Sequence, residues 1–145
     1  MLIEHILAET KDRQVISIGP NATVREALHL LVQHRIGSLP VLDPEGKLIG
    51  IFTERDVLYG ECTDPRHFHR RPIKEVMTPN PLVCCPGDTV QNAMETMSRH
   101  KIGHLPVVVD DRVVGLVSVG DLVKSLHGQA EAEKEHLIAY IHGST

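Results

Sequence analysis

Two short motifs in this chain pair a hydroxyl with a carboxylate three residues later: Thr53 with Asp56, and Ser118 with Asp121. Each motif follows a short apolar run and precedes an amphipathic one, which predicts a junction between a strand and a helix. A carboxylate at such a junction can accept hydrogen bonds from both hydroxyls of a ribose. The start of a helix also favours phosphate, because its free N–H groups carry the positive end of the helix dipole. The competing interpretation is an ordinary helix cap, which uses the same residue types.

A basic pair stands ahead of each motif, His34-Arg35 in the first half of the chain and His100-Lys101 in the second. Arginine is a planar fork for phosphate and lysine a mobile point charge, so each pair suits one phosphate or a longer polyphosphate. Cations in the last turn of a helix also complement its dipole, and this interpretation is about equally well supported. Arg55 lies inside the first motif where the second has Gly120. The two regions are therefore expected to bind unequally.

The motifs recur because the chain contains an internal repeat. Residues 23–41 match residues 89–107 at a constant offset, with Thr, Val, Ala, His, Ile-Gly and Leu-Pro-Val in register. After one deletion the match resumes, so that residues 50–57 correspond to residues 115–122. Two copies are too few for a solenoid. They predict a pseudo-symmetric pair within one compact domain.

Each copy has the pattern of a β-α-β-β-α unit, which predicts an α+β fold. Three strands are predicted in each copy: residues 15–18, 39–42 and 48–53, then 82–85, 105–109 and 113–118. A capping box of Thr23 and Glu26 begins the first long helix. Short helices are expected at 2–7 and 129–142, and residues 59–71 are expected to form a solvated linker. The predicted parts are a first unit at 1–71, a second at 72–128 and a terminal helix and tail at 129–145.

Composition restricts the class of protein. The 145 residues carry a net charge of −4 and include two Phe, two Tyr and no Trp, which disfavours a nucleic-acid surface. Glu4 and His5 interrupt the apolar start of the chain, so no signal peptide is predicted, and no apolar run reaches membrane-spanning length. Three cysteines form neither a disulfide framework nor a metal motif. We expect a reduced, cytoplasmic protein with no nucleic-acid or membrane partner.

The repeated block resembles a known family. The order His-Arg-Ile-Gly-Ser-Leu-Pro-Val, then a hairpin, then Gly-Ile-Phe-Thr-Glu-Arg-Asp, occurring twice, is similar to the CBS domain, named for cystathionine β-synthase. A tandem pair is called a Bateman module, and Val-Met-Thr-Pro-Asn-Pro before the second copy is typical of stand-alone bacterial members. The resemblance covers residues 2–127 and implies two repeats packed sheet to sheet, mostly regulatory members, adenosine-containing ligands between the repeats, and flat dimers.

The resemblance also implies the roles of individual residues. Ribose would be held by Asp56 and Asp121, and phosphate would be contacted by Thr53, Ser118, His34, Arg35, His100 and Lys101. Adenine would be contacted by Ile16, Ser17, Ile18, Ala22, Ala27, Ile36, Leu116, Val83, Cys84, Ala93, Ile102 and Ile51, in part through backbone groups near Ile16–Ile18 and Val83–Cys85. Taken singly, each of these apolar side chains fits an ordinary core better. Only their convergence on one cleft would make them a site.

The resulting prediction is a regulatory module that binds an adenine nucleotide and senses energy or redox state. AMP is favoured, ADP, ATP and NAD(H) are alternatives, and S-adenosylmethionine would leave the basic pairs unused. A homodimer and an unidentified protein partner are expected. The alternative is an assembly module that dimerises without a nucleotide. No catalytic set is recognisable, so neither an enzyme nor a catalytic cofactor is predicted, and His67 and His69 lack further ligands for a metal.

Overall fold

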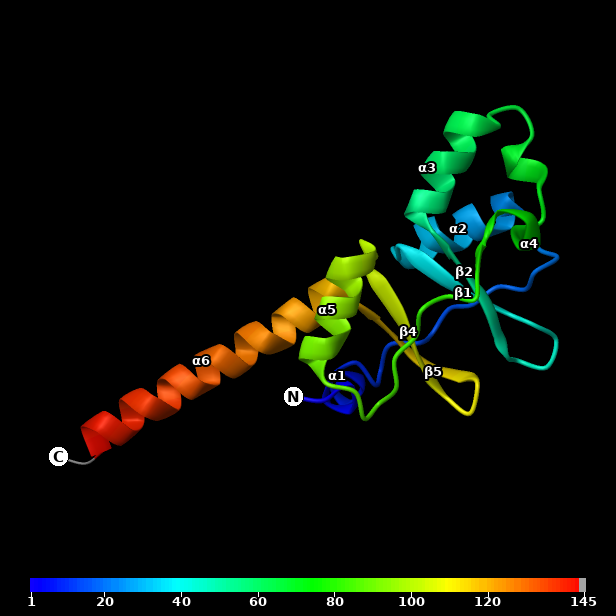
Figure 1. The fold of residues 1–145 in the computed structure, drawn as a ribbon. Helices are drawn as coiled ribbons and strands as arrows, with labels where there is room; N and C mark the ends of the chain where they lie inside the picture. Colours follow the sequence, from blue (N-terminus) through cyan, green and yellow to red (C-terminus); the bar gives the residue numbers. More distant parts are fainter. Residues whose placement is uncertain (144–145) are drawn as a thin grey trace.

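The computed structural model describes residues 1–143 of the chain, as two similar halves and one long helix (Figure 1). The elements in order are α1 (Ile3–Glu9), α2 (Val24–His34), β1 (Ser38–Leu42), β2 (Leu48–Thr53), α3 (Glu54–Thr63), the 3-10 helix η1 (Phe68–Arg70), α4 (Ile73–Val76), β3 (Thr78–Pro79), α5 (Val90–His100), β4 (His104–Val109), β5 (Arg112–Ser118) and α6 (Val119–Gly143). This arrangement confirms the predicted α+β fold of two pseudo-symmetric units.

The corresponding helices α2 and α5 begin and end in the same way. The Thr23 and Thr89 hydroxyls each accept a hydrogen bond from a backbone N–H three residues later, at 3.2 and 3.0 Å. Each helix ends at a residue in the left-handed region, Arg35 with φ 53° and Lys101 with φ 54°. Glycine usually occupies such a position, because a side chain there is strained. Both strained residues lie in the short connection between a helix and the strand that follows it.

The two hairpins set the partners of the motif hydroxyls. β1 pairs antiparallel with β2 and β4 with β5, and each hairpin has a register shift near its tip. Ser38 therefore lies opposite Thr53, and His104 lies opposite Ser118. The short β3 extends the first sheet alongside β2. Each hairpin thus ends at the motif hydroxyl, and the next helix begins at the following residue.

The leading helices are exchanged between the halves. Ile3 and Ile6 of α1 belong to the core of the second repeat, whereas Ile73 of α4 belongs to the core of the first. Backbone hydrogen bonds fix both positions, from Ile3 N–H to Asp88 O at 2.9 Å and from Ile73 N–H to Ala22 O at 2.8 Å. The segment after each short helix must therefore pass between the two repeats.

Several predicted elements differ in the structure. The strands predicted at 15–18 and 82–85 are single parallel bridges, at Ile18 and Cys84, because only one residue of each segment pairs with a hairpin. The segment 59–71 is not a solvated linker, since α3 runs to Thr63 and the Phe68 ring of η1 is buried against Gly60.

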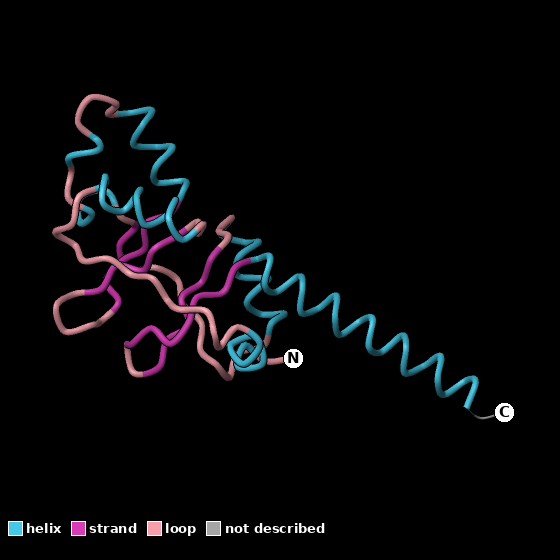
Figure 2. Tube along the Cα trace, turned by 180° about the vertical axis from the view of Figure 1, so that it is seen from behind, coloured by secondary structure: helices cyan, strands magenta, loops and turns pink. Residues whose placement is uncertain are grey.

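The helix predicted at 129–142 is not a separate element but the end of the 25-residue α6, which extends away from the two repeats (Figures 1 and 2). Apolar side chains along its far part, including Leu137 and Tyr140, are exposed. Within residues 1–143, no helix combines the length and the apolar character that a membrane crossing demands.

Candidate functional site

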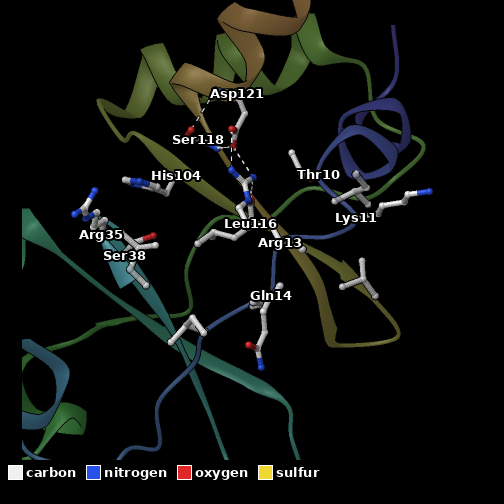
Figure 3. Close-up of a pocket in the computed structure, with 17 residues that line it drawn as sticks. Thr10, Lys11, Arg13, Gln14, Arg35, Ser38, His104, Leu116, Ser118 and Asp121 are labelled. Atoms are coloured by element: carbon white, nitrogen blue, oxygen red, sulfur yellow. Dashed lines mark hydrogen bonds and ion pairs between the residues drawn. The ribbon is translucent and has the colours of Figure 1, made fainter. Parts of the chain in front are cut away.

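Two clefts open between the repeats, and each contains one of the two motif carboxylates. The first cleft has a volume of about 260 Å³ and is lined by Ser118 and Asp121, by the start of β1, and by residues 10, 11 and 13–16 from the segment after α1 (Figure 3). The second cleft is larger, about 520 Å³, and is lined by Thr53, Asp56 and residues 80–82. Small-molecule sites commonly measure about 300–1,000 Å³, so the volume of the second cleft falls within the range of a small-molecule site.

The Asp121 carboxylate of the first cleft is held by an arginine from far away in the chain. Arg13 donates from both ends of its guanidinium, 3.1 Å to Asp121 Oδ1 and 2.9 Å to Oδ2, and also 3.3 Å to the Leu116 carbonyl (Figure 3). The Ser118 N–H donates to the same carboxylate at 2.9 Å. Burial alone would raise the pKa of Asp121, but these hydrogen bonds and the arginine charge outweigh it and hold that pKa below its ordinary value.

Among the residues 1–143, only uncharged groups donate to the Asp56 carboxylate of the second cleft. The Thr53 N–H and hydroxyl donate to Asp56 Oδ2 at 2.9 and 3.2 Å, and the Thr78 hydroxyl donates to Oδ1 at 3.3 Å. In both clefts the motif therefore forms a genuine helix cap, and capping and ligand binding are not mutually exclusive. The clefts differ in the partner from outside the motif: Arg13 donates to Asp121, whereas Thr78 donates to Asp56.

His104 and Gly37 form the wall between the clefts, because both residues line both spaces. A methyl group added at Gly37 would lie 3.1 Å from His104 Cε1 and 3.1 Å from Glu54 Oε1, so the absence of a side chain allows this close approach. Burial lowers the pKa of His104, and the carboxylates Glu54 and Asp121 oppose that effect only in part. The neutral imidazole is thus favoured at this wall.

The predicted site residues separate into the two clefts. The first cleft brings together Ile16, Arg35, Ile36, Leu116, Ser118 and Asp121. The second brings together Ile51, Thr53, Asp56, His100, Lys101 and Ile102. Each cleft thus combines aliphatic side chains, a basic residue and a motif carboxylate, drawn from both repeats. Their roles toward a ligand stay predictions.

The other predicted residues lie outside these two linings, and their roles toward a ligand also stay predictions. Ala27 and Ala93 are buried in the two cores, and Ala22 packs beside the first core. The N–H groups of Ile18 and Cys84 donate to Pro40 O and Pro106 O, and their carbonyls accept from the same hairpins, so these backbone groups already have partners. Three further residues line neither cleft: the half-buried Ser17 and the exposed His34 and Val83.

Sequence reasoning missed several cleft residues. These residues include Lys11, Arg13, Ser38 and His104 in the first cleft and Glu54, Thr78 and Leu82 in the second. His104 and Ser38 occupy the same position of the repeat, so aligning the copies could have found them. The Ser38 hydroxyl is buried at the first cleft without a hydrogen-bond partner among the described residues. Arg13 follows no local pattern, and nothing in the sequence indicates its partner.

Other reactive groups give no sign of catalysis. Burial raises the pKa of the Cys84 thiol to about 12, helped by Asp88 and Cys85, so it remains protonated at neutral pH. Nowhere in residues 1–143 do three His, Cys, Asp or Glu side chains gather as a metal site would require. His69 instead lies 2.9 Å from Glu61.

Comparison with known proteins identifies the family. The CBS domain family matches the chain twice, at residues 7–60 and 73–128, which are the two repeats described above. The chain belongs to the CBS domain family. A curated relative, the CBS domain-containing protein YhcV of Bacillus subtilis, is 34% identical over 114 residues, covering 79% of this chain and 80% of the relative. The two described repeats thus form a tandem pair of CBS domains.

Two solved structures of the same fold contain adenosine ligands. The CBS domain pair of protein MJ0100, in complex with 5'-methylthioadenosine and S-adenosyl-L-methionine, has a TM-score of 0.78 and 31% identity, covering 89% of this chain and 98% of its own. CBSX2 in complex with AMP has a TM-score of 0.72 and 25% identity, covering 81% of this chain and 91% of its own. CBS pairs similar to this chain therefore bind adenosine ligands.

Proposed function

We propose that this CBS pair is a sensor of adenine nucleotides, with AMP as its preferred ligand. The observation that carries the proposal is the pair of equivalent carboxylates, Asp56 and Asp121, each lining a cleft that both repeats build. Each carboxylate would accept hydrogen bonds from the two ribose hydroxyls. The complexes of CBSX2 with AMP and of MJ0100 with adenosine derivatives support the same ligand class.

The rest of each cleft provides for the base and the phosphate. In the second cleft, Ile51 and Ile102 come from opposite repeats and would sandwich adenine. Lys101 lies on the same lining and would meet the phosphate. In the first cleft, Ile36 and Leu116 would contact the base, and the partnerless Ser38 hydroxyl would gain a partner. The ribose of AMP would pair with the motif carboxylate and its phosphate with the cation, whereas the sulfonium centre of S-adenosylmethionine is itself positive and stands where AMP has its phosphate.

The proposed mechanism is a change of population. A ligand that touches both repeats favours the inter-repeat geometry that it fits best, and only this difference in affinity can shift an equilibrium. The second cleft lies next to α3, and the first contains Asp121, in the first turn of α6. We propose that α6 carries the change to a protein partner.

Self-association is the second candidate function, and exposed apolar side chains favour it. Val32 of α2 and Leu58 and Tyr59 of α3 are 79%, 72% and 71% exposed on the first repeat. We infer that these side chains form one apolar patch, and exposed apolar patches mark protein contacts. We propose a homodimer through this face, in the cytoplasm, either alongside nucleotide binding or, in the assembly alternative, without it.

A thermal-unfolding panel with AMP, ADP, ATP, NAD, NADH and S-adenosylmethionine tests the proposal. A ligand at a hundred times its dissociation constant adds about 2.7 kcal/mol to the folded state. For a domain of this size the midpoint should rise by about 5–10 °C. The largest rise is expected with AMP. A panel without any rise would contradict nucleotide binding and favour the assembly alternative.

A further inference from the structure

The first cleft contains Arg13, a charged side chain that lies outside both hydroxyl–carboxylate motifs. Arg13 reaches into it from the segment after α1 and forks onto both oxygens of Asp121, 108 residues away (Figure 3). The carboxylate is mostly shielded, with 17% of its side chain exposed, while 49% of the arginine side chain is exposed. The arginine is thus the more accessible half of the pair.

The two clefts differ in charge because of this segment. Among the residues lining the first cleft, the cations are Lys11, Arg13 and Arg35, and the one carboxylate is Asp121. In the second cleft the cations are Arg55 and Lys101, and the carboxylates are Glu54 and Asp56. With histidines neutral, the first lining carries an excess of two positive charges and the second carries none. Phosphate is therefore attracted more strongly to the first cleft.

Because Arg13 already pairs with Asp121, a ligand of the first cleft must replace both halves of this ion pair. A ribose that pairs with Asp121 must displace Arg13 from the carboxylate oxygens. Adenosine offers the released guanidinium no anion in return, so a charge-assisted pair would be lost. A nucleotide offers a phosphate, whose oxygens match the planar fork as a carboxylate does. The exchange is balanced only for a ligand that carries both groups.

We propose that Arg13 determines the specificity of the first cleft: it holds Asp121 while the cleft is empty and transfers to the ligand's phosphate when ribose takes its place. The inference rests on the proposed nucleotide function and deepens it. The first cleft takes adenine nucleotides with at least one phosphate, and it discriminates against adenosine and 5'-methylthioadenosine, which carry no anion for the released guanidinium. The second cleft, whose carboxylate meets no arginine within residues 1–143, discriminates less.

Isothermal titration with AMP and with adenosine tests the inference. An Asp56→Ala background weakens binding at the second cleft, and an Asp56→Asn background repeats the test with an amide oxygen that can still accept from the Thr53 N–H in the capping box. In either background AMP should bind more tightly than adenosine by about tenfold or more, as expected for a charge-assisted pair. Adding Arg13→Ala should strengthen adenosine binding and weaken AMP binding, reducing the ratio to about two or three. Arg99→Ala is the matched control, because Arg99 is exposed and pairs with Glu95 within α5.

The outcomes separate the two proposals. An unchanged ratio after Arg13→Ala overturns the inference, as does an equal gain for both ligands, which would make the fork a simple obstruction. AMP binding that is confined to the second cleft also overturns it and leaves the proposed function standing. If neither ligand binds the unmodified chain, the proposed function itself fails. Arg13→Gln, which keeps much of the side-chain bulk, should reproduce the result of Arg13→Ala.

Discussion

The two clefts use the same motif in different surroundings. In both, a carboxylate caps the helix that begins at the cleft, and a symmetric hydrogen bond joins that helix to the preceding Ile-Gly turn, from Glu54 N–H to Gly37 O and from Val119 N–H to Gly103 O. The walls differ, because each is completed by the segment after a leading helix. That segment carries Lys11 and Arg13 in the first cleft, whereas in the second it is uncharged.

This difference shows how a repeat diversifies its sites. The motif is fixed by its structural task at the helix start, so it changes little between the copies. The leading segments carry no such task along their whole length, and they can acquire charge without disturbing the cores. The ligand preference of each cleft is therefore set by residues outside the repeated motif.

The largest predicted effect concerns the stability of the first repeat, whose core contains the buried ring of Phe68. Phe68→Ala should lower the free energy of unfolding by about 3–5 kcal/mol, because a large cavity would remain beside Gly60. Urea unfolding measures this. The exposed His67→Ala is the control and should have little effect, and a similar loss from both variants would contradict the buried role of Phe68.

The next effect separates the clefts by their carboxylates. Asp121→Ala should weaken binding at the first cleft and Asp56→Ala at the second, each by about tenfold to hundredfold, which is the contribution of hydrogen bonds to a charged group. Titration calorimetry would report half the parent stoichiometry for each variant, with the fold checked by circular dichroism. Binding like that of the parent in both would refute the ribose role.

A smaller effect should follow from neutralising Glu54, one of the two acidic residues of the second cleft. Glu54→Gln leaves Asp56 in place and removes a negative charge near the expected phosphate. AMP affinity at this cleft should rise by about twofold to fivefold, and the gain should shrink at high salt. Glu61→Gln, on the same helix but outside the cleft, is the control. A gain that ignores salt would show that charge is not the cause.

The smallest effect concerns stability and pH. The pKa of Asp121 is held below its ordinary value, so the Arg13 pair stabilises the fold fully above the unfolded-state pKa of about 3.9 and loses this effect as pH falls through the folded-state value. Arg13→Ala should therefore reduce the free energy of unfolding by about 0.2–1 kcal/mol at pH 7 and by less in acid. Chemical unfolding at several pH values measures the difference. A difference that grows in acid would have the wrong sign.

The sequence was informative wherever a property repeats or depends on neighbours in the chain. It predicted the two copies, the cap at Thr23, both hairpins and several residues that line one or the other cleft. It could not predict the exchange of the leading helices, because α1 and α4 have the same apolar spacing and fit either core equally well.

Other features depend on contacts that no local pattern reveals. The burial of Phe68 depends on a space that Gly60 leaves in another element, and a single aromatic residue has no period to detect. The terminal helix seemed to begin after Gly128, yet α6 passes through that residue without a break. Arg13 finds Asp121 only because the exchange of α1 brings its segment across the first cleft.

A crystal structure of the chain with AMP tests the central claim most directly. We expect AMP in one or both clefts, with its ribose hydroxyls within hydrogen-bond distance of Asp56 or Asp121 and adenine between aliphatic residues of the two repeats. In the first cleft, Arg13 should lie on the phosphate instead of on Asp121. AMP bound away from both carboxylates, or clefts that stay empty at saturating AMP, would contradict the account.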